Sequence, residues 1–141
     1  MRADCLKQSV LFPDLIDRDL VARFDDPAGT SDGGAILLKA VDRKLGLTEA
    51  VVAALADRRQ PGKVRHSLHD LMRQRVYGLA CGYEDANDAG RLASDPMHKL
   101  LIDRDPFDGD DLASQSTLSR FENSLRPAPS FRAGMRPDRQ I

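Results

Sequence analysis

Apolar residues recur at helical spacing through most of the middle of the chain. The clearest run begins after Ser67, which together with Asp70 resembles a capping box that has Asp where Glu or Gln is usual. The residues that follow predict a helix with one apolar stripe, formed by Leu68, Leu71, Met72, Val76, Leu79, Ala80 and Tyr83. The side chains predicted to lie away from that stripe are those of Asp70, Arg73, Gln74 and Tyr77.

Shorter helices are predicted on both sides of this one. Before it, a helix over about residues 33–45 stops at Gly46, and Thr48 can act as the N-cap of a second helix over residues 49–56. After it, a helix is predicted over residues 85–93. Asp95-Pro96 starts the next helix, whose inward-facing residues are Met97, Leu100 and Leu101. Ser114 can cap a last helix that runs to Asn123 and buries Leu118 and Phe121.

Both ends of the chain lack helical periodicity. Leu20, Ala22 and Phe24 follow a period-two pattern that suits a short strand, so residues 1–30 are predicted to form an extended segment. From Leu125 onward, three of the eight prolines and four arginines occur without periodicity, a composition that buries too little surface to offset its ordering entropy. Residues 125–141 are therefore predicted to be a disordered tail, which is either a functional basic extension or an aberrant end of the coding sequence.

Composition supports a mainly α fold, with one small helical domain over residues 31–124. Hydrophobic residues make up 41% of the 141 residues, but aromatic residues are only 5% and tryptophan is absent, so the core must consist of aliphatic side chains.

Cys5 and Cys81 are far apart and form no CxxC pattern, which predicts neither a disulfide framework nor a zinc site. No apolar run approaches the roughly 18 residues of a membrane span. We expect a cytoplasmic protein without a membrane partner.

Charge is distributed unevenly, although the formal net charge is only −1. Residues 57–75 contain six basic side chains against two acidic ones, whereas residues 84–111 contain nine acidic side chains against three basic ones. The first stretch is suited to contact with a polyanion, and the second is expected to repel one.

Neither a metal site nor a nucleophilic catalytic group is predicted. The acidic stretch 103–111 does not match a calcium-binding loop, because its spacing places the wrong residue types at the ligand positions. His66 and His69 are three residues apart, but zinc would need further ligands and only the distant Cys81 and His98 could supply them. A surface or capping role is favoured for both histidines.

Two stretches carry a resemblance to a known family. LMRQRVYGLACGYEDAND over residues 71–88 and LASQSTLSRFEN over residues 112–123 are similar to the N-terminal region of the group 1 type of DDE transposases. The resemblance implies a ribonuclease-H-like catalytic core in intact relatives, in which three carboxylates hold two divalent metal ions, expected to be Mg²⁺, that cut and join DNA strands. This chain ends before the strand that carries the first of those carboxylates in relatives. We therefore expect a truncated chain that is not an enzyme, with no catalytic residue and no cofactor of its own.

Two groups of residues are candidates for binding double-stranded DNA at the ends of a mobile element. The first group is basic and consists of Arg58, Arg59, Lys63, Arg65 and Arg73. The second lies on a segment that resembles a recognition helix and consists of Gln115, Ser116 and Arg120. A DNA-bound chain would be associated with the nucleoid. In the alternative interpretation the chain is an interaction module that binds intact transposase, or itself, and inhibits transposition without contacting DNA.

Overall fold

The computed structural model describes residues 20–22 and 29–125. Their elements are η1 (Gly33–Ala35), α1 (Ile36–Leu45), α2 (Leu47–Ala53), η2 (Pro61–Lys63), α3 (Leu68–Ala80), η3 (Ala86–Asp88), α4 (Ala89–Leu92), α5 (Pro96–Leu101) and α6 (Gln115–Ser124), where η denotes a short 3₁₀ helix. This arrangement confirms the mainly α fold class. The longest of these helices, α3, has 13 residues, whereas a helix that crosses a bilayer needs about 20 apolar ones, so none of the described helices qualifies.

The predicted N-terminal strand does not form in the part of the chain that the structure describes. Leu20 makes only an isolated β-bridge, and Phe24 lies outside the described residues. Most of the predicted extended segment 1–30, and residues 126–141 of the predicted tail, also lie outside them.

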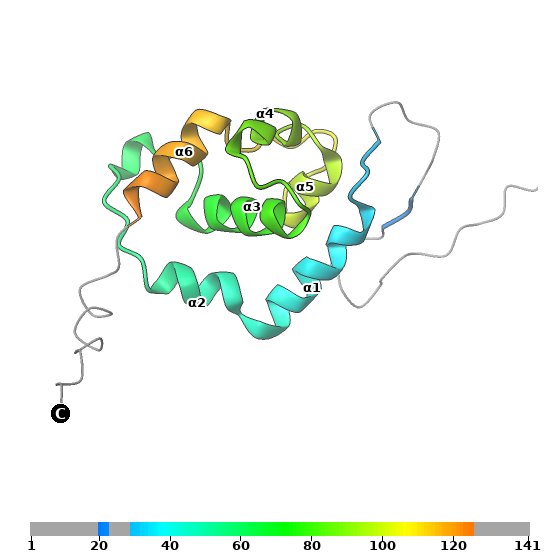
Figure 1. The fold of residues 1–141 in the computed structure, drawn as a ribbon, viewed down its shortest axis with the longest axis horizontal. Coiled ribbons are helices and arrows are strands. Elements are labelled where there is room, and N and C mark those ends of the chain that lie inside the picture. The colour runs from blue at the N-terminus through cyan, green and yellow to red at the C-terminus, as the bar shows by residue number, and fades with distance from the viewer. Residues whose placement is uncertain (1–19, 23–28, 126–141) are drawn as a thin grey trace, which may run out of the picture.

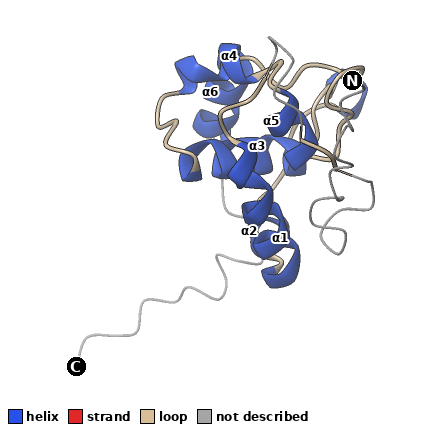
Figure 2. Ribbon diagram, turned by 90° about the vertical axis from the view of Figure 1, so that its right-hand side faces the viewer, coloured by secondary structure: helices blue, strands red, loops and turns tan. Residues whose placement is uncertain are grey.

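Helix α3 is the central element of the fold. It contacts α1, α2, α5 and α6. Figures 1 and 2 agree that α1 and α2 lie on one side of α3 as an arm, while α4 and α6 lie on the other side. One core cluster surrounds Tyr77 of α3 and includes Ile36, Leu100, Leu101 and Leu112. The second core cluster consists of Leu71, Met72, Ala89, Ala113, Leu118 and Phe121.

The buried face of α3 differs from the predicted stripe. Arg73, Gln74 and Tyr77 are buried, while Leu79 is 46% exposed. Neighbouring elements surround most of the helix and supply partners for its polar groups. The Gln74 side chain donates to the carbonyl of Ala113 (2.9 Å) and accepts from the amide of Ala113 (3.0 Å), so this polar residue is fully compatible with the core.

The predicted helix starts are confirmed at α3 and α5. Ser67 accepts a hydrogen bond from the amide of Asp70 (2.9 Å). Asp95 accepts from the amides of Met97 and His98 at the start of α5, where Pro96 occupies the first turn. Met97, Leu100 and Leu101 of that helix are all buried, as predicted.

Two capping predictions need correction, whereas the predicted stop of α1 is confirmed. Gly46 ends α1 with a left-handed φ of 62°. Thr48 does not cap α2, because the helix already begins at Leu47; instead its buried hydroxyl donates to the carboxylate of Asp42 (2.6 Å). Ser114 does precede α6, but its hydroxyl bonds to the side chains of the next turn and not to a backbone amide.

The C-terminus of α5 is closed by an aspartate in a position that usually requires glycine. Asp103 has φ 66°, its amide donates to the carbonyl of Leu100 (3.1 Å), and the amide of Arg104 donates to the carbonyl of Lys99 (3.0 Å). This pair of bonds is the Schellman arrangement. Aspartate tolerates the left-handed region better than most residues with a Cβ.

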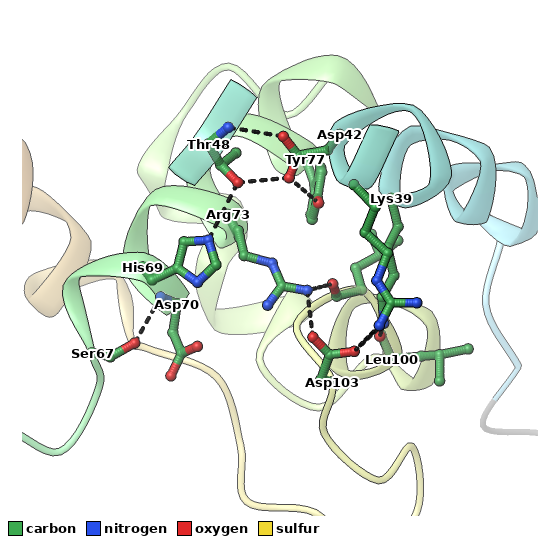
Figure 3. A network of polar contacts seen from close by, with 12 residues as sticks. Lys39, Asp42, Thr48, Ser67, His69, Asp70, Arg73, Tyr77, Leu100 and Asp103 are labelled. Atoms are coloured by element: carbon green, nitrogen blue, oxygen red, sulfur yellow. Dashed lines mark hydrogen bonds and ion pairs between the residues drawn. The ribbon is translucent and has the colours of Figure 1, made fainter. Parts of the chain in front are cut away.

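The contacts of the Asp103 carboxylate explain why this position holds an aspartate. It accepts hydrogen bonds from Lys39 Nζ of α1 (2.6 Å) and from Arg73 Nη2 of α3 (2.7 Å), as Figure 3 shows. The same two cations also donate to the carbonyls of Leu100 and Leu101 at the end of α5, both at 2.6 Å. Lys39 and Arg73 are 2% and 7% exposed, so this network ties three helices together in the interior.

Candidate nucleic-acid interface

The basic residues predicted to contact DNA lie mostly on the connection between α2 and α3. We call residues 57–66 the basic loop. Its flanks are fixed by Leu55 and Leu68, which pack against the same core cluster as Leu118 and Phe121 of α6. The basic loop and α6 are therefore neighbours, and Figure 1 shows η2 beside α6.

Three cations of the basic loop are exposed. Arg58, Lys63 and Arg65 all lie at the surface, and within the described part of the chain none of them forms an ion pair or a side-chain hydrogen bond. Lys63 ends η2, which begins with Pro61. These three side chains are thus available to contact an anionic partner.

Arg59, by contrast, forms hydrogen bonds within the basic loop and stabilises it. Its guanidinium donates to both carboxylate oxygens of Asp57 (2.8 and 2.7 Å) and to the carbonyl of His66 (2.9 Å). The hydrogen bonds from Arg59 lower the pKa of Asp57 to about 2. Arg59 therefore joins the two ends of the basic loop, and the charge of Asp57 offsets its own.

The basic loop is also anchored to the acidic stretch 103–111. His66 is buried, and its Nδ1 lies 3.0 Å from Nη2 of Arg104. Nη1 of the same guanidinium donates to the carbonyls of Asp110 and Asp111. Burial lowers the pKa of His66, and the positive charges of Arg104 and Arg65 lower it further. His66 Nδ1 accepts the hydrogen bond from Arg104, because a guanidinium can only donate, and the burial of His66 contradicts its predicted surface position.

The acidic stretch is less negative than a count along the sequence indicates. The carboxylate of Asp103 is paired with Lys39 and Arg73, both of which come from outside residues 84–111. These two cations offset the negative charge of Asp103 within the fold.

Helix α6 has one buried and one exposed face. Leu118 and Phe121 are buried, as predicted, while Gln115, Ser116 and Arg120 are exposed. The Arg120 guanidinium lies along the helix and donates to the backbone carbonyl (3.0 Å) and the hydroxyl (3.3 Å) of Ser116. An ion pair between Arg75 and Glu122 holds α6 against α3.

Arg73 is separated from the other predicted DNA-binding residues. It lies in the interior and donates to Asp103 and to the carbonyl of Leu101. Burial works to lower the pKa of Arg73, but the hydrogen bond and charge of Asp103 outweigh it and raise that pKa. Its charge is paired with that of Asp103 inside the fold, so Arg73 is not part of the exposed surface.

Sequence reasoning missed a cluster formed by Asp32, Cys81 and His98. Their potential ligand atoms all lie within 4.8 Å of one another. His98 Nε2 lies 2.9 Å from Asp32 Oδ2, to which the hydroxyl of Tyr83 also donates (2.8 Å). The three residues are distant in sequence, and no local spacing pattern points to their meeting.

A family model described as Transposase DDE domain group 1 matches residues 12–136. The chain belongs to this family. No curated protein and no solved structure matches the chain.

Membership of the DDE transposase family confirms the resemblance carried by residues 71–88 and 112–123, which both fall within the match. Intact transposases of this kind are nucleases that act on DNA and typically use divalent metal ions. The basic loop and α6 of this transposase-family chain present exposed cationic and polar side chains.

Proposed function

We propose that this chain recognises the terminal inverted repeats of a mobile element during DNA transposition. The observation that carries the proposal is the position of three exposed cations, unpaired within residues 29–125, beside the exposed polar face of α6, in a chain of a family that acts on DNA. The cations are those of Arg58, Lys63 and Arg65.

The two parts of this surface suit different contacts. Exposed arginine and lysine side chains on a loop bind phosphates, which positions a protein on the duplex without reading its sequence. Helix α6 has 10 residues, and an α-helix with its side chains is about 10–12 Å in diameter, which fits a major groove about 12 Å wide. Gln115 can pair with adenine, and Arg120 with guanine if it leaves Ser116.

We further propose that this region contributes DNA recognition and not strand cleavage. Within the described ranges, the one cluster of three potential metal ligands contains a cysteine and a histidine, whereas the two-metal chemistry of the family uses carboxylates. DNA binding through phosphates and base edges needs no metal ion. The activity would take place in the cytoplasm, at the nucleoid.

Titration of the chain with its element's inverted repeat and with a shuffled duplex, over a series of salt concentrations, tests this function. We expect tighter binding to the repeat and a steep loss of affinity as salt rises. The triple substitution Arg58→Ala, Lys63→Ala and Arg65→Ala should lower the slope of log affinity against log salt by about 0.9 for each phosphate contact removed. Lys44→Ala, which removes an exposed cation of α1, is the matched control and should leave the slope unchanged.

Base reading by α6 has its own test. Gln115→Ala or Arg120→Ala should lower the preference for the repeat over the shuffled duplex by about 1–3 kcal/mol if each contacts a base. Asn123→Ala, at an exposed position of the last turn of α6, serves as the control. Equal affinity of the folded chain for both duplexes would exclude sequence recognition, and the absence of any salt-sensitive binding would exclude DNA contact altogether.

A second candidate function, an interaction module that inhibits intact transposase, is favoured by an exposed apolar stripe on the arm. Leu37, Val41 and Leu45 recur every four residues on α1 and are 49%, 54% and 69% exposed. In this function the stripe would pack against the same helix of another copy, as in the self-complementary interfaces of symmetric dimers. Val41→Glu would then abolish both self-association in sedimentation and inhibition of intact transposase.

A further inference from the structure

Three segments of the fold bring a carboxylate, a thiol and an imidazole together. Asp32 precedes η1, Cys81 follows the last residue of α3, and His98 lies in α5. One potential ligand atom from each lies within 4.8 Å of the other two, and no other group of three such residues occurs over residues 29–125. The cluster is distinct from the basic loop and from the exposed face of α6.

The distances are compatible with a small tetrahedral ion after a slight adjustment. Zinc binds sulfur at about 2.3 Å and nitrogen or oxygen at about 2.0–2.2 Å, so tetrahedral ligand atoms lie roughly 3.3–3.7 Å apart. His98 Nε2 and Asp32 Oδ2, now at 2.9 Å, would separate by about half an ångström, and no pair would need to close by more than about 1 Å. Rotation of side chains can supply such shifts.

The surroundings hold the ligands in place. His98 is 2% exposed, and the side chain of Asp32 is 13% exposed. The hydroxyl of Tyr83 donates to Asp32, and the Tyr83 ring packs edge-on against the His98 ring with centroids 5.8 Å apart. Hydrogen bonds and packing of this kind orient the ligands of metal sites.

Zinc fits this donor set better than magnesium or calcium. Thiolate and imidazole are ligands for zinc, whereas magnesium and calcium prefer oxygen atoms alone. Cys81 is only partly buried, so its side of the cluster is open to a water molecule as a fourth ligand.

We propose that Asp32, Cys81 and His98 form a Zn²⁺ site whose fourth ligand is water. On binding, the thiol proton of Cys81 passes to solvent, and any proton on His98 Nε2 moves to the other ring nitrogen or to solvent. The ion would link the segment before α1 to the end of α3 and to α5. Its role is to stabilise this arrangement, and it is separate from the carboxylate-bound ions that cleave DNA in intact relatives.

Titration of the full chain with Co²⁺, a spectroscopic substitute for Zn²⁺, tests the proposal. We expect saturation at one equivalent, with a thiolate-to-cobalt charge-transfer band that excess Zn²⁺ removes. Cys81→Ser should abolish the band, and His98→Gln should weaken binding. Cys5→Ser, which removes the other of the two cysteines, is the control and should keep the band. Zn²⁺ should also raise the unfolding temperature of the chain and of the Cys5→Ser variant, but not that of Cys81→Ser.

Absence of the band in the folded wild-type chain, its persistence in Cys81→Ser, or its loss in Cys5→Ser would overturn the proposal. A second measurement covers the case in which Cys81→Ser or His98→Gln does not fold. In the wild-type chain, Zn²⁺ should slow alkylation of Cys81 relative to Cys5, with both sites quantified by peptide mass spectrometry. Unchanged relative rates would contradict metal binding at Cys81.

Discussion

Replacing Asp103 with asparagine isolates the electrostatic part of the network shown in Figure 3. Asparagine has nearly the same shape as aspartate and tolerates the left-handed backbone of this position, so the turn after α5 should be kept. The substitution removes the negative charge that Lys39 and Arg73 share in the interior. Two buried cations would then face each other without a counterion.

The structure sets the expected magnitude. Removing one partner of a buried ion pair costs about 3–5 kcal/mol. The side chain of Asp103 is 52% exposed, so water compensates part of the loss, and we expect the free energy of unfolding to fall by about 2–3 kcal/mol. For a domain of this size, this corresponds to a decrease in unfolding temperature of roughly 8–24 °C.

Urea denaturation followed by far-ultraviolet circular dichroism measures the effect. Asp108→Asn is the matched control, because it makes the same chemical change at an exposed position of the same loop. If Asp103→Asn lowers the free energy of unfolding by no more than about 0.5 kcal/mol beyond the control, the usual range for surface substitutions, then the shared carboxylate does not stabilise the fold as argued.

Three further predictions concern stability and use the same assay. Gln74→Leu should cost about 2–4 kcal/mol, because it leaves both the amide and the carbonyl of Ala113 without their partner in the core; a loss below about 1 kcal/mol would contradict this. Gly82→Ala should cost about 1–2 kcal/mol through backbone strain alone, since φ is 93° and the space for a Cβ is open; an unchanged urea midpoint would refute it. For pH, burial works to raise the pKa of Asp103, but hydrogen bonds from Lys39 and Arg73 outweigh it and hold that pKa below its usual value. The stability that Asp103 contributes is therefore complete above about pH 4 and is lost as pH falls through the lowered pKa. In urea titrations at decreasing pH, the free energy of unfolding of Asp103→Asn should fall less steeply than that of the wild type.

Local signals were sufficient to predict helices and several of their boundaries. The Asp95-Pro96 start of α5 and the stop of α1 at Gly46 depend on contacts within a few residues, so the sequence contains all the information they need. The buried positions Leu118 and Phe121 follow from helical periodicity in the same way.

Long-range pairing accounts for what the sequence did not predict. Helical periodicity places Arg73 and Gln74 away from the apolar stripe of α3, but their partners Asp103 and Ala113 are 30 and 39 residues further along the chain. Local periodicity cannot show that a polar side chain will meet a partner in the interior. For the candidate DNA surface, the exposure of most residues followed from the pattern, whereas the interior position of Arg73 did not.

The hydrogen bonds that Arg59 forms within the basic loop affect the entropy cost of binding a partner. Fixing the backbone of a flexible loop costs about 1–2 kcal/mol of conformational entropy per residue. Because Arg59 joins Asp57 to the carbonyl of His66, much of that cost falls on folding and not on binding. The basic loop would already be ordered before it binds a partner. Its binding should therefore resemble the docking of a rigid body more than folding coupled to binding.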